Sequence, residues 1–335
     1  MRVLFIGGTG VISSACSQLA VERGIELYLF NRGESNRPAP AGARVLRGDI
    51  RDVELARNAL VGREFDVVVD WVAYMPDQVQ RDIELFRERT GQYIFISSAS
   101  AYQTPPASLP VTESTPLDNP YWSYSRDKIA CEDLLVRAYR EHKFPATIVR
   151  PSHTYDQTML PLRGGYTMID RMRKGKPVVV HGDGASLWTL THHRDFAKGF
   201  VGLLGNVHAI GESFHITSDE ILTWNQIYEI LARAAGAPAH LVHIASESIA
   251  AFDPDWGAEL MGDKTHSMIF DNTKIKRAIP GFDATIPFAQ GAREMLDWYD
   301  ADATRRVVDA EFDRLLDHLI AAYESVLPQG ARQVA

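Results

Sequence analysis

Cysteine is scarce in this sequence. Its 335 residues include only Cys16 and Cys131. The two lie far apart, and no Cys-x-x-Cys pair occurs, which argues against a disulfide framework and against a cysteine-ligated metal site. Both cysteines fall within helical patterns, so we expect the fold to hold together without a disulfide.

Long apolar runs are absent as well. No stretch approaches about 18 apolar residues, the length at which a membrane-spanning helix is expected. The chain opens with "MRVLFIGGTG", a predicted strand running into a turn, without the charged and apolar regions of a signal peptide. We therefore expect a cytoplasmic protein.

Positive charge is not in excess. Lys and Arg number 35 against 43 Asp and Glu, so the formal net charge is −8, and no long basic run occurs. Such a chain is a poor candidate for binding nucleic acid or an anionic membrane. Hydrophobic residues make up 45% and charged residues 23%, a composition typical of globular proteins with a sizeable core.

The first half of the chain alternates short apolar runs with helical patterns. Strands are expected at 2–6, 26–30, 43–48, 66–72, 93–97 and 146–150, and helices at 12–23, 51–61, 77–89 and 122–142. Several strands are continuous apolar runs, as expected where a parallel sheet is covered on both faces. The alternation predicts an α/β fold with a doubly wound parallel sheet.

A glycine-rich turn, "FIGGTGVISSA", joins the first strand to the first helix. The first glycine allows a tight turn, the second lets the backbone approach a pyrophosphate, and the helix N-terminus offers free N–H groups to that anion. Ser13 takes the third position, where a small residue suffices. The turn therefore predicts a Rossmann-type dinucleotide site that includes Gly7, Thr9, Gly10, Val11 and Ile12.

Two later strand ends bear on the identity of the dinucleotide. Asn31 and Arg32 follow the second strand, where a carboxylate would bind the ribose of NAD and repel a 2′-phosphate. A neutral amide beside a guanidinium favours NADP without excluding NAD, although Arg32 could also be a solvated loop residue. After the third strand, Asp49 is placed to accept from the adenine amino group, with Ile50 beside it.

A hydroxyl and a Tyr–Lys pair are candidates for the chemistry. Ser98 ends the fifth strand and should point into the crevice where ligands bind. Tyr124 and Lys128 lie four residues apart and share one helix face. That spacing alone also fits two surface residues. Because Cys131 continues the same face toward the sheet, a buried role for Lys128 is expected.

These residue types suit proton transfer coupled to hydride transfer. An ammonium near a phenol can lower its pKa from about 10 by about 1–3 units, so Tyr124 could act as an acid or base near neutral pH. Ser98 would hydrogen-bond the same substrate oxygen, Lys128 would reach the nicotinamide ribose, and the hydride would move between the adjoining carbon and the nicotinamide.

The chain resembles the extended short-chain dehydrogenase/reductase superfamily, in its NAD-dependent epimerase/dehydratase group. The resemblance rests on "GGTGVIS", "GDI", "DWVA", "SSASAY", "YSRDK", "RPSHTYD" and "GDGASLWTLTHHRDFA". "FNRGE", "TWNQIYEIL" and "IFDNTKIKR" are most similar to the branch of the chloroplast stem-loop-binding proteins and their bacterial relatives. The resemblance implies that Ser98, Tyr124 and Lys128 form the catalytic triad and that Ala73 and Pro151 contact the cofactor.

The resemblance also implies a class of substrate, although this sequence differs from the family pattern at several substrate-binding positions. It points to a sugar, nucleotide-linked in most of the family, and to a substrate site that includes Tyr74, Ser98, Ser100, His153 and Trp188. Dehydratases of the group carry acidic residues after the catalytic Ser or Thr, but Ala99 and Ser100 stand there, which disfavours a 4,6-dehydratase. His153 and Trp188 replace an Asn and an Arg that contact the substrate diphosphate. Arg163, Arg171 or Arg173 could substitute.

After residue 150 the pattern becomes irregular. Helices are expected near 165–174, 195–205, 223–236 and 286–298, a strand at 213–217, and an amphipathic segment at 304–326. We expect an NAD(P)-binding domain at 1–150 with returning segments from 178–217, a mainly substrate-binding lobe at 151–326, and a frayed tail at 327–335.

The histidines in this part do not predict a metal site. His181, His192 and His193 lack further ligands at suitable spacing, and in the family pattern Asp195 would cap a helix. His153 could be a second acid–base group or an ordinary loop residue.

Two functions follow. The first is an NAD(P)-dependent epimerase or oxidoreductase acting on a sugar, as a homodimer through helices 77–89 and 122–142. The second is a cofactor-binding RNA-binding or regulatory protein, since stem-loop-binding relatives are reported to engage RNA. The negative net charge and the intact Ser–Tyr–Lys set favour the first.

Overall fold

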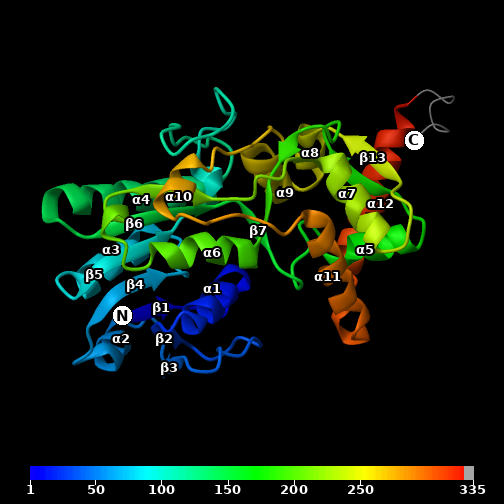
Figure 1. Cartoon of the computed structure of the whole chain (residues 1–335). Coiled ribbons are helices and arrows are strands. Elements are labelled where there is room, and N and C mark those ends of the chain that lie inside the picture. Colours follow the sequence, from blue (N-terminus) through cyan, green and yellow to red (C-terminus); the bar gives the residue numbers. More distant parts are fainter. Residues whose placement is uncertain (328–335) are drawn as a thin grey trace.

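The computed structural model of the protein describes residues 1–327, and its centre is a seven-stranded parallel sheet in the order β11-β6-β5-β4-β1-β2-β3 (Figure 1). The strands are β1 (Arg2–Ile6), β2 (Glu26–Asn31), β3 (Arg44–Arg47), β4 (Phe65–Asp70), β5 (Thr90–Ile96), β6 (Ala146–Pro151) and β11 (Ser213–Ile216). The predicted doubly wound α/β fold of the Rossmann type is confirmed.

The strand order reverses beside β1. From there the chain runs outward through β2 and β3 on one side and through β4, β5, β6 and β11 on the other. In sheets of this kind the crevice at the carboxyl ends of the strands, next to this reversal, is where ligands bind. The glycine turn after β1 and the segment after β4 both open into that crevice.

Helices cover both faces of the sheet, which explains the continuous apolar runs of its strands. On one face lie α1 (Val11–Glu22) and α6 (His193–Leu203), which pack side by side (Figure 1). On the other lie α2 (Val53–Leu60), α3 (Pro76–Phe86) and α4 (Ser123–His142). Alternate residues of β1 face the two cores: Val3 and Phe5 pack toward α1, whereas Leu4 and Ile6 pack toward α2 and α3.

The second half of the chain builds a separate core. Its helices are α5 (Tyr166–Arg173), α7 (Trp224–Ala234), α8 (Ser246–Phe252), α9 (Pro254–Glu259), α11 (Phe288–Asp300) and α12 (Ala310–Ser325), while α10 (Thr273–Ala278) packs near β11. Short strand pairs accompany them: β7 (His153–Tyr155) with β10 (Leu190–His192), β8 (Val178–His181) with β13 (Leu241–Ile244), and β9 (Leu187–Trp188) with β12 (Leu222–Thr223). Within residues 1–327, no helix combines the length and apolarity needed to cross a membrane.

Several local predictions differ from the structure. Helix α6 begins at His193, and its N-cap is His192, whose ring nitrogen accepts from the Arg194 N–H at 3.2 Å. The predicted cap Asp195 instead lies in the first turn, where its carboxylate binds Lys198 Nζ at 2.6 Å and the Ile286 N–H at 2.8 Å. The amphipathic segment at 304–326 is α-helical only from residue 310, after a short 3-10 helix at Ala303–Arg305.

The segment 246–264 was not predicted as helical, yet it forms α8, α9 and a π-helix at Leu260–Lys264. The segment from 193 to 216 returns to the sheet as α6 and β11, while β8 pairs with β13 in the second core. The division of the chain near residue 150 stays a prediction. The tail was predicted at 327–335, and its residues 328–335 lie outside the described residues.

Candidate functional site

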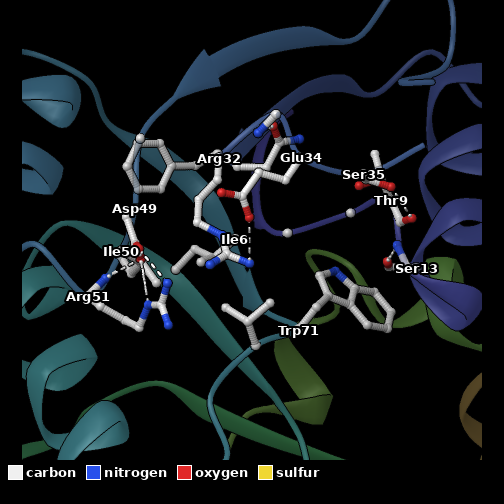
Figure 2. Close-up of a pocket in the computed structure, with 18 of the residues that line it drawn as sticks. Ile6, Thr9, Ser13, Arg32, Glu34, Ser35, Asp49, Ile50, Arg51 and Trp71 are labelled. Atoms are coloured by element: carbon white, nitrogen blue, oxygen red, sulfur yellow. Dashed lines mark hydrogen bonds and ion pairs between the residues drawn. The ribbon is translucent and has the colours of Figure 1, made fainter. Parts of the chain in front are cut away.

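A cavity of about 510 Å³ lies over the glycine turn, between the segments that follow β1, β2, β3 and β4 (Figure 2). We call it the glycine-turn cavity. Gly7 and Gly8 have φ angles of +98° and +100°, which glycine adopts without strain. A Cβ on Gly8 would lie 2.6 Å from a Leu29 methyl carbon, so a larger residue would not fit. Ser13 Oγ accepts from the Gly10 N–H at 2.8 Å, so Ser13 also fixes the turn.

Two ion pairs line the glycine-turn cavity, one in the segment after β2 and one in the segment after β3 (Figure 2). Arg32 Nη2 lies 3.0 Å from Glu34 Oε2, and Arg51 Nη2 lies 2.6 Å from Asp49 Oδ2. The hydrogen bond from the Arg51 side chain holds the pKa of Asp49 at about 2. Asn31 Oδ1 accepts from the Gly33 N–H at 3.1 Å, so Asn31 shapes the turn that carries Arg32.

Lys128 is buried beneath the mouth of the crevice. Its Nζ donates to the carbonyl oxygens of Ala73 and Ile96, both at 2.8 Å, and its side chain is only 2% exposed. Nζ also lies 4.6 Å from the centroid of the Tyr74 ring and 5.8 Å from that of Tyr124. Burial lowers the pKa of Lys128 to about 8.

Tyr124 stands in the first turn of α4 with its ring between two others. The ring centroids of Trp122 and Tyr74 lie 4.8 Å and 6.3 Å from it. Burial raises the pKa of Tyr124 to about 12, and the hydrogen bond with Ser98 offsets only part of that rise. The predicted lowering of this pKa by Lys128 is therefore wrong for this structure.

A second cavity, of about 270 Å³, is lined by Ser98, Tyr124, His153 and Trp188 among others. We call it the Tyr124 cavity. Ser100 also lines it, but its hydroxyl bonds Ser98 Oγ at 2.9 Å and Ser125 Oγ at 2.8 Å. Ser100 thus holds Ser98 in place.

The remaining predicted residues divide between the cavities. Thr9, Gly10, Ile50 and Tyr74 line the glycine-turn cavity, whereas Ile12 and Pro151 line the Tyr124 cavity. Tyr74 was predicted to bind substrate, and the structure places it on the glycine-turn cavity and not on the Tyr124 cavity. Two residues line neither cavity: Ala73 is 2% exposed and binds Lys128 through its carbonyl, and the Val11 carbonyl accepts from His193 Nδ1.

Three charged residues of the second core complete the Tyr124 cavity and were missed in the sequence. Glu259, Asp263 and Lys264 come from the end of α9 and the π-helix. No local pattern marks them, because only the packing of the second core against α4 brings them to Tyr124.

The histidines bind protein groups. His192 Nε2 lies 3.1 Å from Glu294, and His181 Nε2 lies 3.0 Å from the Lys264 carbonyl oxygen. Among residues 1–327, no three His, Cys, Asp or Glu side chains gather closely enough to hold a metal ion. Burial lowers the pKa of His153 to about 3, so its ring is neutral near pH 7.

Known proteins resemble the chain over most of its length. The chloroplast stem-loop binding protein of 41 kDa b from Arabidopsis thaliana is 26% identical, over 97% of this chain and 85% of that protein. The 2′-dehydrokanamycin reductase of Streptomyces kanamyceticus is also 26% identical, over 84% of this chain and 80% of that protein.

Solved structures share the fold. The dTDP-glucose 4,6-dehydratase of Bacillus anthracis, in complex with NAD, has a TM-score of 0.72 at 18% identity, covering 91% of this chain and 98% of that one. The UDP-glucuronic acid 4-epimerase of Bacillus cereus has a TM-score of 0.71 at 19% identity, covering 90% and 99%. The model of the NAD dependent epimerase/dehydratase family matches residues 3–217, and the chain belongs to that family.

Proposed function

We propose that the protein is an NAD(P)-dependent epimerase or oxidoreductase that transfers a hydride at a hydroxyl-bearing or keto carbon of a sugar. The observation that carries this proposal is the placement of Ser98 and Tyr124 on a cavity beside the glycine-turn cavity, with the buried Lys128 Nζ 5.8 Å from the centroid of the Tyr124 ring. The rings of Tyr74 and Tyr124, one from each cavity, are only 6.3 Å apart.

The residues around the glycine turn fit a dinucleotide. Two glycines at positive φ and the start of α1 match a backbone that a pyrophosphate approaches closely, while the lack of room for a Cβ at Gly8 reflects close packing of the turn against Leu29. Arg32 at the end of β2 favours NADP, as a partner for a 2′-phosphate. When bound, such a cofactor supplies or accepts the hydride.

The protein's own residues handle the proton. A phenol with a pKa of about 12 is protonated near pH 7, so Tyr124 is suited to donate a proton to the oxygen of a carbonyl that is being reduced. Ser98 would hydrogen-bond that oxygen. Lys128 would hold the positive charge beneath both groups and stabilise the phenolate that is left. Donation of this proton is the step that reduction of a carbonyl requires.

The chain divides accordingly. Residues 1–150, with the returning segment 193–216, would hold the cofactor, and the other residues of 151–326 would mainly bind the substrate. A homodimer would pair α3 and α4, which lie side by side on one face. Relatives named for nucleotide sugars support that substrate class, while 2′-dehydrokanamycin reductase names a substrate without a nucleoside diphosphate.

Replacing Tyr124 with Phe tests the proposal. Because only the proton donor is lost, turnover should fall by at least about 100-fold, while cofactor affinity, measured by fluorescence titration, should stay within about twofold. Tyr121→Phe is the matched control, since Tyr121 lies three residues earlier, is 40% exposed and lines neither cavity. Near-normal turnover in Tyr124→Phe would contradict the assignment.

Identifying the cofactor separates the two reaction types. Mass spectrometry of the supernatant after denaturation should reveal a tightly held NAD(P) if the protein is an epimerase, because the hydride returns to the same substrate. A protein that is purified empty and oxidises added NADPH is a reductase.

A binding function is the second candidate, because of the stem-loop binding relative. A gel-shift assay with a structured RNA, run beside the turnover assay, distinguishes the two. RNA binding at physiological salt without turnover of any sugar would favour the second candidate.

A further inference from the structure

The Tyr124 cavity contains more carboxylates than cations. Glu259 and Asp263 contribute two carboxyl groups, and Lys264 contributes one ammonium. The side chains of Glu259, Asp263 and Lys264 are 25%, 18% and 9% exposed, so these charges face the cavity or the protein rather than bulk water. His153 adds no positive charge near pH 7, because burial keeps its pKa at about 3.

The single ammonium is already paired. Lys264 Nζ lies 2.5 Å from Glu259 Oε1 and 3.3 Å from Asp263 Oδ2. Glu259 has a further partner in Arg163, whose Nη1 lies 3.2 Å from Oε2. Among the described residues, Asp263 has only the longer contact to Lys264, so it is the carboxylate with most capacity left for a ligand.

The surface beside the Tyr124 cavity also has two carboxylates and one ammonium. A hollow of about 390 Å³ shares Thr189 and Phe270 with the Tyr124 cavity and is lined by Asp219, Asp271 and Lys276. Lys276 Nζ is held 2.5 Å from Asp219 Oδ2. A diphosphate that extended from the Tyr124 cavity into this hollow would meet net negative charge in both, which costs free energy through like-charge repulsion.

Trp188 contributes no charge to the wall of the Tyr124 cavity. It is 3% exposed and lines that cavity, but its indole nitrogen is buried and has no hydrogen-bond partner among the described residues, so it is not available to a ligand in the cavity. Trp188 also stands where the family resemblance places an arginine for the substrate diphosphate.

We propose that the Tyr124 cavity takes a sugar that carries an ammonium group and no nucleoside diphosphate, with Asp263 as the partner of the ammonium. This rests on the proposed function, because it names the substrate of the same site. The sugar hydroxyls would bond Ser98 and Tyr124, and the ammonium would shift the net charge of the cavity toward zero.

Calorimetric titration with three probes tests the proposal: methyl glucosaminide, methyl glucoside and UDP-glucose. The full-length protein should bind the amino sugar about tenfold more tightly than the neutral sugar, the difference between a charge-assisted and a neutral hydrogen bond. UDP-glucose should bind more weakly than the amino sugar. Asp263→Asn should abolish the tenfold preference and leave the affinity for methyl glucoside unchanged.

Asp255→Asn is the matched control, because Asp255 is an exposed carboxylate of α9 that lines neither cavity. It should keep the preference. Tighter binding of UDP-glucose, or a preference that survives Asp263→Asn, would overturn the proposal and leave hydride transfer on sugars standing. Conversely, a preference that depends on Asp263, without turnover of any sugar, would support the ligand class and contradict the proposed function.

Discussion

Arg32 carries an ion pair that a 2′-phosphate would have to share. Its guanidinium is half exposed and lies 3.0 Å from the Glu34 carboxylate. Arg32→Ala should weaken NADP binding by about tenfold, since a charge-assisted bond to phosphate is lost, and should change NAD binding little. Fluorescence titration with each cofactor measures both affinities, and equal losses for NAD and NADP would contradict a role in selecting NADP.

Glu34 offers the matched variant. Glu34→Gln removes the competing carboxylate and keeps the size of the side chain, so the guanidinium becomes free for a phosphate. NADP should then bind more tightly than to the unaltered protein, while NAD should not. A loss of NADP affinity in Glu34→Gln would show that the carboxylate binds the cofactor itself.

Which residues could be found from the sequence depends on how local their signal is. Gly7, Ser98 and the Tyr124–Lys128 pair occupy a turn, a strand end and a helix face, so spacing alone marks them, and parallel strands bring such positions to one edge. Asp263 has no local signal, because it reaches the cavity only through the fold of the second core. The pKa of Tyr124 could not be predicted either, since it depends on burial and not on the spacing to Lys128.

The segment after β4 is linked to α4 by a hydrogen bond between the Ala73 carbonyl oxygen and Lys128 Nζ. Asp70 Oδ1 accepts from the N–H groups of Val72 and Ala73 at 2.5 Å and 2.8 Å. The Ala73 carbonyl oxygen in turn accepts from Lys128 Nζ at 2.8 Å. Asp70 is fully buried, so we infer that it positions Lys128 without contacting the ligands.

The pH dependence of turnover tests this support. Burial lowers the pKa of Lys128 to about 8, while the negative charge of Asp70 limits the lowering. In Asp70→Asn the ammonium should lose its proton at lower pH, so the alkaline decline of kcat/KM should move down by about one pH unit. Asp82→Asn removes a neighbouring buried carboxyl but keeps the two hydrogen bonds that Asp70 accepts from the Val72 and Ala73 N–H groups. The alkaline decline of kcat/KM in this variant should therefore stay at the same pH. The same shift in both variants would indicate a general structural effect.

At the scale of elements, the sheet could be predicted well and the second core poorly. The strands of the sheet are apolar runs bounded by turns, and six of the seven lie within two residues of their predicted bounds at both ends, while β5 begins three residues before its predicted start. The segment 246–264 instead consists of two short helices and a π-helix. Helices of six or seven residues are too short for a clear period, and their stability comes from packing.

Taken as a whole, the molecule buries histidines in both of its halves, and this makes its stability sensitive to acid. Burial lowers the pKa of five of them. The pKa falls to about 3 for His153 and to about 4 for His181 and His193. The pKa values of His192 and His215 are lowered in the same direction. In the unfolded chain a histidine has a pKa of about 6.5. Below that pH the unfolded state binds more protons than the folded state, so the free energy of unfolding falls as the pH falls.

A variant at His181 measures the contribution of one histidine to the loss of stability in acid. It is 5% exposed, and a pKa of about 4 against about 6.5 unfolded corresponds to about 2 kcal/mol of stability lost between pH 7.5 and pH 5. Urea unfolding of His181→Gln at the two pH values should therefore show a loss about 2 kcal/mol smaller than in the unaltered protein, whatever the variant's stability at pH 7.5. His208→Gln, at an exposed position, should keep the full loss. Equal losses in His181→Gln and the unaltered protein would mean that His181 takes up its proton in the folded state, and that the acid sensitivity resides in the other four buried histidines or in other groups.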